Sequence, residues 1–144
     1  MKFAQLLPIL LVIVVDQAAK YLVVGNGNFQ INTGIALNFF QDNNLLNFFL
    51  SLLVLIAIIT YYLRFVVLKN RELLLTWSWG FIIGGGISNL FDRVIHQGVV
   101  DFIGLFNLPR FNFADIAITL GVLGIILVVF LKNNNDEKLH GQPR

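Results

Sequence analysis

The stretch LLNFFLSLLVLIAIITYYLRFVVL, residues 45–68, decides the fold class of this 144-residue chain. It holds a single charged residue, Arg64. The run exceeds the roughly 20 residues that an α-helix needs to cross a hydrocarbon core about 30 Å thick. A helix on the surface of a soluble protein would carry charged residues along the face turned toward water. We therefore predict a transmembrane helix here.

Three further apolar runs flank this one, at about Phe3–Val24, Leu73–Val94 and Phe113–Leu131. The whole chain is 57% hydrophobic and only 12% charged, with a mean hydropathy of +0.78. A soluble domain of this size needs more polar surface. We predict an all-α integral membrane protein with four transmembrane helices, in which residues 1–132 form one domain. Residues 133–144 are polar, and we expect a disordered cytoplasmic tail there.

The basic residues predict the orientation of the spans. Seven of the ten fall on one side of the predicted membrane, namely Lys2, Arg64, Lys69, Arg71, Lys132, Lys138 and Arg144. By the positive-inside rule, both termini are expected in the cytoplasm. The two longer loops, residues 25–44 and 95–112, then face outward.

The first apolar run has an alternative interpretation as a cleaved signal peptide, because Lys2 precedes the apolar stretch Leu6–Val15. Two observations favour a permanent span instead. The apolar run continues through Tyr21–Val24, and an acid and a base, Asp16 and Lys20, lie one helical turn apart within it.

The first outer loop carries a turn signal, Asn26-Gly27, followed by alternating apolar and polar residues. This pattern is typical of a short strand or hairpin. We expect it over residues 26–40, as a small β-rich cradle at the membrane surface. Asn43 and its neighbours Asp42 and Asn44 are suited to cap the second helix.

Several classes of site are excluded by composition. The chain has no cysteine, which rules out disulfides, thiolate metal sites and a cysteine nucleophile. Its two histidines, His96 and His140, are far apart, so we expect neither a metal nor a cofactor. A net charge of +2 does not suggest nucleic-acid binding.

Ionisable residues inside the spans need an explanation, because each costs about 2.5–3.5 kcal/mol or more near the bilayer centre. Asp16 and Lys20 share one helix face and are predicted to form a structural ion pair, or to hold a loop or substrate backbone. Asn89, Asp92 and Arg93 also share a face. Either structural support between helices or substrate binding explains them equally well.

Asp101 and Asp115 are two further acids, fourteen residues apart, that lie near the outer ends of the predicted spans. Gly104 and Pro109 allow the segment between them to fold back. By itself, Asp115 fits an acid favoured by the helix dipole, with Asn112 as the cap. Two carboxylates that share one proton suit peptide hydrolysis. The spacing alone does not establish that they pair.

The order of five motifs is more specific, and it resembles the bacterial lipoprotein signal peptidases, or type II signal peptidases. The motifs are Asp16-Gln17-Ala18-Ala19-Lys20, Asn32-Thr33-Gly34-Ile35-Ala36, Gly84-Gly85-Gly86-Ile87-Ser88-Asn89-Leu90-Phe91-Asp92-Arg93, Gly98-Val99-Val100-Asp101-Phe102 and Phe111-Asn112-Phe113-Ala114-Asp115. They correspond in the family to D-x-x-x-K, N-x-G-A-A, G-G-x-x-G-N-x-x-D-R, G-x-V-x-D-F and F-N-x-A-D, and the fourth stretch matches the V-x-D-F part of its pattern with residues 99–102.

The resemblance implies a monomeric aspartyl endopeptidase in the bacterial cytoplasmic (inner) membrane, with its active site at the outer face among the membrane lipids. Its substrates would be diacylglyceryl-modified prolipoproteins, cut just before the lipidated cysteine. Asp101 and Asp115 carry over as the catalytic pair. A surrounding substrate-binding or structural set also carries over, comprising Asp16, Lys20, Asn32, Gly85, Asn89, Asp92, Arg93, Asn112 and Ala114. Asn89, Asn112 or Arg93 would be suited to hold substrate carbonyls.

Some positions depart from the family pattern. Ser88 replaces a usual glycine, Ile35 and Leu37 replace small and aromatic residues, and the segment between the two aspartates is short. Two other functions were weighed: a small ion or proton transporter, in which buried acids relay ions, and a lipoprotein-binding membrane protein without protease activity.

Overall fold

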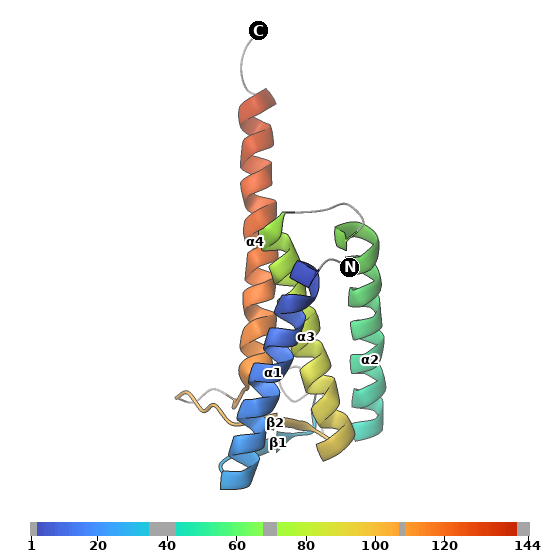
Figure 1. Ribbon diagram of the computed structural model, residues 1–144, viewed down its shortest axis with the longest axis vertical. Helices are drawn as coiled ribbons and strands as arrows, with labels where there is room; N and C mark the ends of the chain where they lie inside the picture. Colours follow the sequence, from blue (N-terminus) through green and yellow to red (C-terminus); the bar gives the residue numbers. More distant parts are fainter. Residues whose placement is uncertain (1–2, 35–42, 68–71, 107–108, 141–144) are drawn as a thin grey trace.

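Four long helices dominate the computed structural model, which describes residues 3–34, 43–67, 72–106 and 109–140. They are α1 (Phe3–Asn26), α2 (Asn44–Tyr61), α3 (Leu73–His96) and α4 (Phe113–His140), and a π-helix, η1 (Tyr62–Val67), continues α2 (Figure 1). Each contains a segment long and apolar enough to cross a membrane: Gln5–Asn26, Asn44–Phe65, Leu73–His96 and Phe113–Asn133. The four predicted spans are confirmed.

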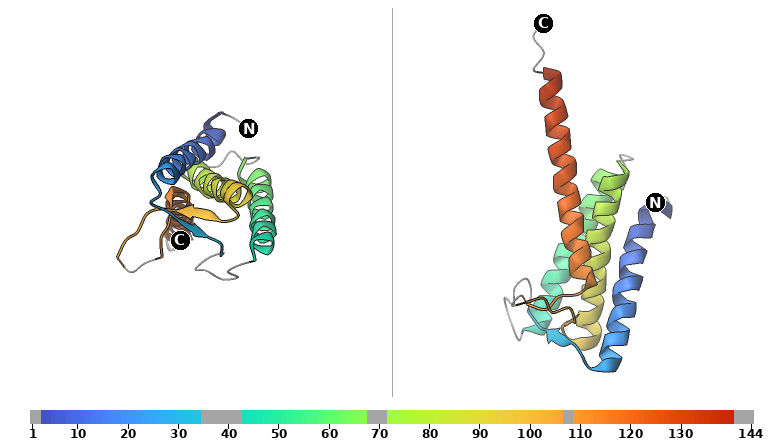
Figure 2. Two further views of the ribbon diagram at one scale, coloured as in Figure 1. Left: turned by 90° about the horizontal axis from the view of Figure 1, so that it is seen from below. Right: turned by 90° about the vertical axis from the view of Figure 1, so that its left-hand side faces the viewer.

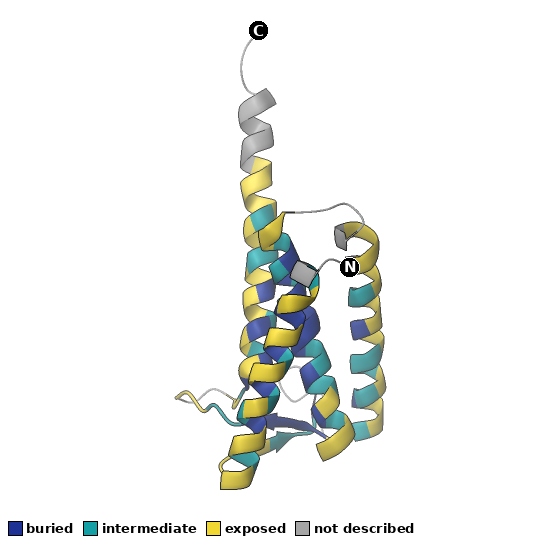
Figure 3. Ribbon diagram, in the orientation of Figure 1, coloured by how far each residue is buried: buried dark blue, intermediate teal, exposed yellow. Residues whose placement is uncertain are grey.

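α3 is the central helix, and α1, α2 and α4 pack around it (Figure 2). The buried residues concentrate on α3 and on the faces turned toward it, while the outward faces are exposed (Figure 3). Those outward faces are apolar: Val14 on α1 and Leu53 on α2 are each 64% exposed. Such a surface suits a lipid environment, where apolar side chains need no cover.

Glycines on α3 let the neighbouring helices approach closely. A Cβ on Gly84 would lie 2.8 Å from the carbonyl oxygen of Ile9 on α1, and a Cβ on Gly85 would lie 2.6 Å from that of Ala114 on α4. Small residues commonly allow such backbone contacts between membrane helices. The two adjacent glycines therefore hold α1 and α4 against two sides of α3.

The two outer loops together form a small sheet. β1 (Gln30–Asn32) pairs antiparallel with β2 (Val99–Asp101), with Gln30 opposite Asp101. The sheet crosses one end of the helix bundle (Figure 2). A short strand within residues 26–40 is confirmed, and among the described residues its partner is β2 of the other loop, which alternation alone does not identify. The remainder of that segment, residues 35–42, lies outside the described residues.

α4 continues past the predicted end of the domain at residue 132 and reaches His140. The expected disorder is therefore wrong for residues 133–140. Extending an existing helix adds one hydrogen bond for each residue fixed, so polar residues can prolong a helix that they would not nucleate.

The beginning of α1 and the end of α4 lie at one end of the bundle, and the sheet lies at the other (Figure 1). At the C-terminal end of α3, Gln97 adopts a left-handed conformation (φ 57°), which turns the chain directly into β2. This turn brings the segment that carries Asp101 across the end of the bundle.

Candidate active site

Asn112 connects the two aspartates that the sequence singled out. Its side-chain amide donates to Asp101 Oδ1 at 2.8 Å. Its backbone N–H donates to Asp115 Oδ2 at 3.2 Å, and its side-chain oxygen accepts from the backbone N–H of Asp115 at 2.9 Å. The last two bonds form a reciprocal cap at the start of α4. The cap thus places Asp115, in the first turn of the helix, beside Asp101 at the end of β2.

Each carboxylate accepts a further hydrogen bond from an asparagine of another element. Asn32 of β1 donates through Nδ2 to Asp101 Oδ2 at 3.0 Å. Asn89 of α3 donates through Nδ2 to Asp115 Oδ1 at 2.9 Å. The Oδ1 atom of Asn89 in turn accepts from the side-chain amide of Asn112 at 3.2 Å. Three neutral amide side chains therefore orient the pair.

Asp101 is only 3% exposed, and its environment favours the protonated form. Burial raises the pKa of its carboxyl from the ordinary value of 3.8 to about 6. The nearby charge of Asp115 also raises this pKa, whereas hydrogen bonds from Asn32 and Asn112 and the charge of Lys20 lower it. A carboxyl in this condition can carry a proton at a pH where an exposed aspartate is ionised.

A second buried cluster lies beside this pair and is built on Lys20. Its Nζ lies 2.6 Å from Asp16 Oδ2 and 2.7 Å from Asp92 Oδ2. It also donates to Asn89 Oδ1 at 3.0 Å. The ion pair predicted between Asp16 and Lys20 is present, and Asp92 completes it as a second acid. The lysine charge is compensated within the cluster, while its bond to Asn89 connects it to Asp115.

The two acids of this cluster also hold the backbone next to the candidate catalytic residues. Asp16 Oδ1 accepts from the N–H of Ala114 at 2.9 Å, and Asp92 Oδ2 accepts from the N–H of Val100 at 3.1 Å. Ala114 precedes Asp115, and Val100 precedes Asp101. One buried acid thus supports each member of the pair, one residue before it in the chain.

Arg93 holds the first outer loop. Its guanidinium donates through Nη2 to the carbonyl oxygen of Gly34 at 3.0 Å and through Nη1 to that of Asn89 at 3.4 Å. From α2, the Asn47 side chain donates to the carbonyl oxygen of Thr33 at 2.6 Å. Of the two roles left open for Arg93, structural support of the site is the one these contacts describe.

Two residues of the site were missed by the sequence reasoning. Ser88 donates through Oγ to Asp16 Oδ2 at 2.7 Å. Gln17 donates to Asp92 Oδ1 at 2.8 Å and to Ser88 Oγ at 2.9 Å. The sequence shows Ser88 only as a departure from a family glycine, but its position one turn before Asp92 on the same helix face is a signal that could have found it. The other departures, Ile35 and Leu37, lie outside the described residues.

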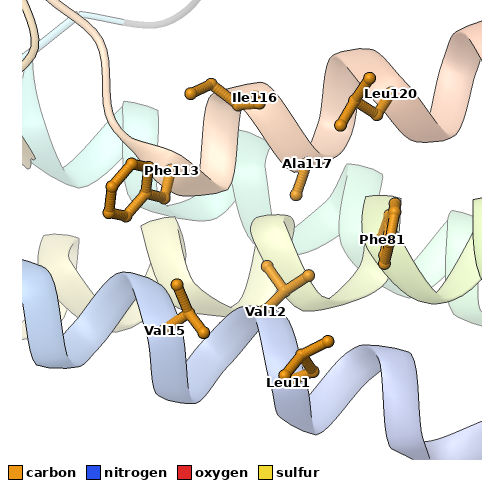
Figure 4. Close-up of a pocket in the computed structure, with 8 residues that line it drawn as sticks. All are labelled: Leu11, Val12, Val15, Phe81, Phe113, Ile116, Ala117 and Leu120. Atoms are coloured by element: carbon orange, nitrogen blue, oxygen red, sulfur yellow. The ribbon is translucent and has the colours of Figure 1, made fainter.

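An apolar groove of about 220 Å³ lies between α1 and α4, with α3 behind it (Figure 4). Leu11, Val12 and Val15 of α1 face Phe113, Ile116, Ala117 and Leu120 of α4, and Phe81 belongs to α3. Phe113 also packs edge-on against Phe102, the residue after Asp101, with ring centroids 5.4 Å apart. The groove is thus lined by Ile116, the residue after Asp115, and by Phe113, which packs against the residue after Asp101.

The structure brings every predicted site residue to one end of the bundle. Asp16, Lys20, Asn32, Asn89, Asp92, Arg93, Asp101, Asn112, Ala114 and Asp115 are connected by the contacts above, and Gly85 packs against the backbone of Ala114. Their assembly from α1, β1, α3, β2 and α4 explains why the motifs are dispersed along the chain.

Comparison with known sequences places the chain among proteins of one kind. A family model described as "Signal peptidase (SPase) II" matches residues 8–131. The lipoprotein signal peptidase of Shouchella clausii is 32% identical over 145 residues, which cover 90% of this chain and 94% of the relative. That of Campylobacter jejuni is 33% identical over 144 residues, covering 90% and 89%.

Two solved structures share the fold. Both are bacterial membrane enzymes solved by the in meso method, at 2.3 Å and 1.9 Å resolution. The first has a TM-score of 0.79 and 21% identity, and the alignment covers 100% of this chain and 94% of the other. The second has a TM-score of 0.75 and 23% identity, with coverage of 90% and 94%.

Proposed function

The chain belongs to the signal peptidase II family, aspartyl peptidases that remove signal peptides from prolipoproteins, and we propose that Asp101 and Asp115 are its catalytic residues. The observation that carries this assignment is the double contact of Asn112, which hydrogen-bonds both carboxylates at once. A pair held in this way can act on a single bound water.

The proposed chemistry needs one ionised and one protonated carboxyl. The ionised member takes a proton from the attacking water, and the protonated member donates to the oxygen of the scissile carbonyl. Proton transfer to the leaving nitrogen then completes hydrolysis. The raised pKa of Asp101 supports the presence of a proton on the pair near neutral pH. The proton is shared, so the apparent pKa values belong to the pair.

We propose that the substrate is a prolipoprotein whose cysteine already carries a diacylglyceryl group, and that the cut falls just before this cysteine. A substrate anchored by its lipid stays at the membrane, and the candidate pair lies where the spans end. The apolar groove beside Phe113 and Ile116 supports access from the hydrocarbon side.

The end of the bundle that carries the site is proposed to face outward. Arg64 in η1 and Lys132 in α4 lie toward the opposite end, where the basic residues of the chain concentrate. The positive-inside rule then places both termini in the cytoplasm. A proton or ion transporter fits these residues less well, because Lys20 is already paired with both Asp16 and Asp92.

The assignment is tested by the isosteric variants Asp101→Asn and Asp115→Asn. Each removes the proton exchange that the mechanism needs, so cleavage of a lipid-modified precursor should fall by at least about 10³-fold while the protein still inserts and folds. The matched control is Glu72→Gln, which neutralises an exposed acid at the far end of α3. It should cleave at the normal rate.

Full cleavage by either aspartate variant would remove that residue from the mechanism. The same assay with an unlipidated precursor tests the substrate separately. A large loss of cleavage without the lipid is expected, and equal cutting of both precursors would contradict the requirement for a diacylglyceryl group.

A further inference from the structure

The segment between β2 and α4 projects sideways from the bundle. Ile103 and Phe111 close it at its base, with Ile103 N donating to Phe111 O at 2.9 Å and Phe111 N donating to Ile103 O at 3.0 Å. We call this segment the 103–111 loop. Its described residues extend away from the helices beside the beginning of α4 (Figures 1 and 2).

Two consecutive residues of the described part of the 103–111 loop are apolar and uncovered. Leu105 is 46% exposed and Phe106 is 94% exposed. Phe106 also has a φ of 51°, a left-handed conformation that is unusual for a bulky side chain. Residues in such sparsely populated conformations cluster at functional sites. Here it presents an aromatic ring outward, at the side of a membrane protein.

The ends of the neighbouring helices indicate the environment of the 103–111 loop. α1 and α3 both extend beyond the 103–111 loop in the direction of the sheet (Figure 1). Their last turns still present exposed apolar side chains, including Leu22 at 64% on α1 and Val94 at 63% on α3. These surfaces require an apolar environment beside the bundle, and the loop extends into that same zone.

We propose that the 103–111 loop inserts Leu105 and Phe106 into the bilayer, in the leaflet on the side of the active site. The occupant of this surface is the lipid itself. Aromatic residues are favoured at the boundary between hydrocarbon and headgroups. Arg110, which is exposed near the base of the loop, is suited to meet lipid phosphates.

The insertion has a consequence for the active site, because both ends of the loop are attached to it. Ile103 follows Asp101 by two residues, and Phe111 directly precedes Asn112. The hydrogen bonds between Ile103 and Phe111 make this attachment short and ordered. The loop in the bilayer and the two carboxylates are therefore connected over a few residues.

A spin label can measure this depth, because the chain has no cysteine of its own. The Leu105→Cys variant is labelled, reconstituted in phospholipid vesicles, and probed with oxygen, which concentrates in lipid, and with a water-soluble nickel chelate. Labelled Val14→Cys, on the lipid face of α1, gives the lipid reference, and labelled Asn28→Cys, exposed in the first outer loop, gives the water reference. The label at position 105 should resemble the lipid reference.

Second substitutions at position 106 test the role of the ring. Phe106→Asn removes the apolar side chain and tolerates a positive φ, so the label should shift toward the water reference. Phe106→Trp keeps an interfacial aromatic, so the label should stay in lipid. A label at position 105 that is accessible to the nickel chelate beside native Phe106 would overturn the proposal. So would protection of the label from the chelate that grows with the protein-to-lipid ratio, because it would report a second copy of the chain. Protection of the label that appears only with substrate would also overturn it.

Discussion

Both candidate catalytic carboxylates accept hydrogen bonds from asparagine side chains, which are neutral donors. Asn32, Asn89 and Asn112 orient the two groups without adding charge. A cation in direct contact would favour the ionised form of both acids and remove the shared proton. The cation Lys20 instead contacts Asp16 and Asp92, and its hydrogen bond toward the pair goes to Asn89. The site thus separates its charge compensation from its proton chemistry.

This separation predicts the effect of Asn32→Ala on the pH dependence. The hydrogen bond from Asn32 lowers the pKa of Asp101, so its removal should raise that pKa above its present value of about 6. Cleavage requires a proton on the pair, and the rate falls as the pH rises and this proton is lost. The alkaline limb of the pH–rate profile should therefore move to higher pH.

The rate at the optimum should also fall by about tenfold, because a hydrogen bond to a charged group contributes about 1.5–3 kcal/mol. Asn28→Ala, exposed in the same loop, is the control and should leave the profile unchanged. An alkaline limb that stays in place, or moves to lower pH, would contradict the role given to Asn32.

At the scale of the elements, the sequence predicts those helices whose position depends on hydrophobic residues. The four spans are predicted by continuous apolar runs. The acids within them stand out as candidate site residues because charged residues are rare in such runs. The sheet does not follow, because β1 meets β2 only after α3 has brought the second loop back across the bundle. The helical extension of α4 does not follow from the sequence either, because polar residues resist burial but can still continue a helix.

In the candidate site, too, the sequence motifs identify residues, but only the fold shows their contacts. Asp101 and Asp115 were identified from their motifs, but their bridging by Asn112 required the fold. Ser88 is the clearest case, because the sequence marks it as a departure from glycine and the structure makes it a donor to Asp16. Its role depends on the distance between α1 and α3, which no local pattern contains.

Helix packing around Gly85 gives a prediction at this scale. In Gly85→Ala, the new Cβ would lie 2.6 Å from the carbonyl oxygen of Ala114 and 2.7 Å from Ile118 Cγ1. Because one neighbour is backbone, α4 must move and Asp115 must move with it. We expect a loss of about 1–3 kcal/mol in the free energy of unfolding and a marked fall in kcat.

Thermal unfolding in detergent and a cleavage assay measure these two effects. Gly25→Ala is a matched control, since a Cβ there meets nothing within 4 Å and the residue lies near the end of α1. It should be as stable as the native chain, or slightly more stable. Normal stability and activity in Gly85→Ala would show that α3 and α4 do not need this contact.

Across the whole molecule, one buried cluster connects the membrane spans to the surface sheet. Lys20 of α1 meets Asp92 of α3, Asp16 reaches the first turn of α4, and Asp92 reaches β2. The charges that are costly in a bilayer are therefore placed where three helices and the sheet meet. Breaking such a buried pair costs several kcal/mol, so the cluster holds these elements in one arrangement.

The same arrangement predicts which side of the membrane each end of the bundle faces. By the positive-inside rule, the basic residues predict that the beginning of α1 and the end of α4 lie in the cytoplasm, so that the sheet with the candidate catalytic pair would face outward. Asn28→Cys and Asn133→Cys place single cysteines at exposed positions near the outer and inner ends. In bacterial spheroplasts, a membrane-impermeant maleimide should label only the Asn28→Cys variant, whereas both variants should be labelled after lysis. Labelling of Asn133→Cys alone before lysis would show that the topology is the reverse of the predicted one. The proposed active site would then lie in the cytoplasm, where a substrate with an exported lipoprotein domain would not meet it.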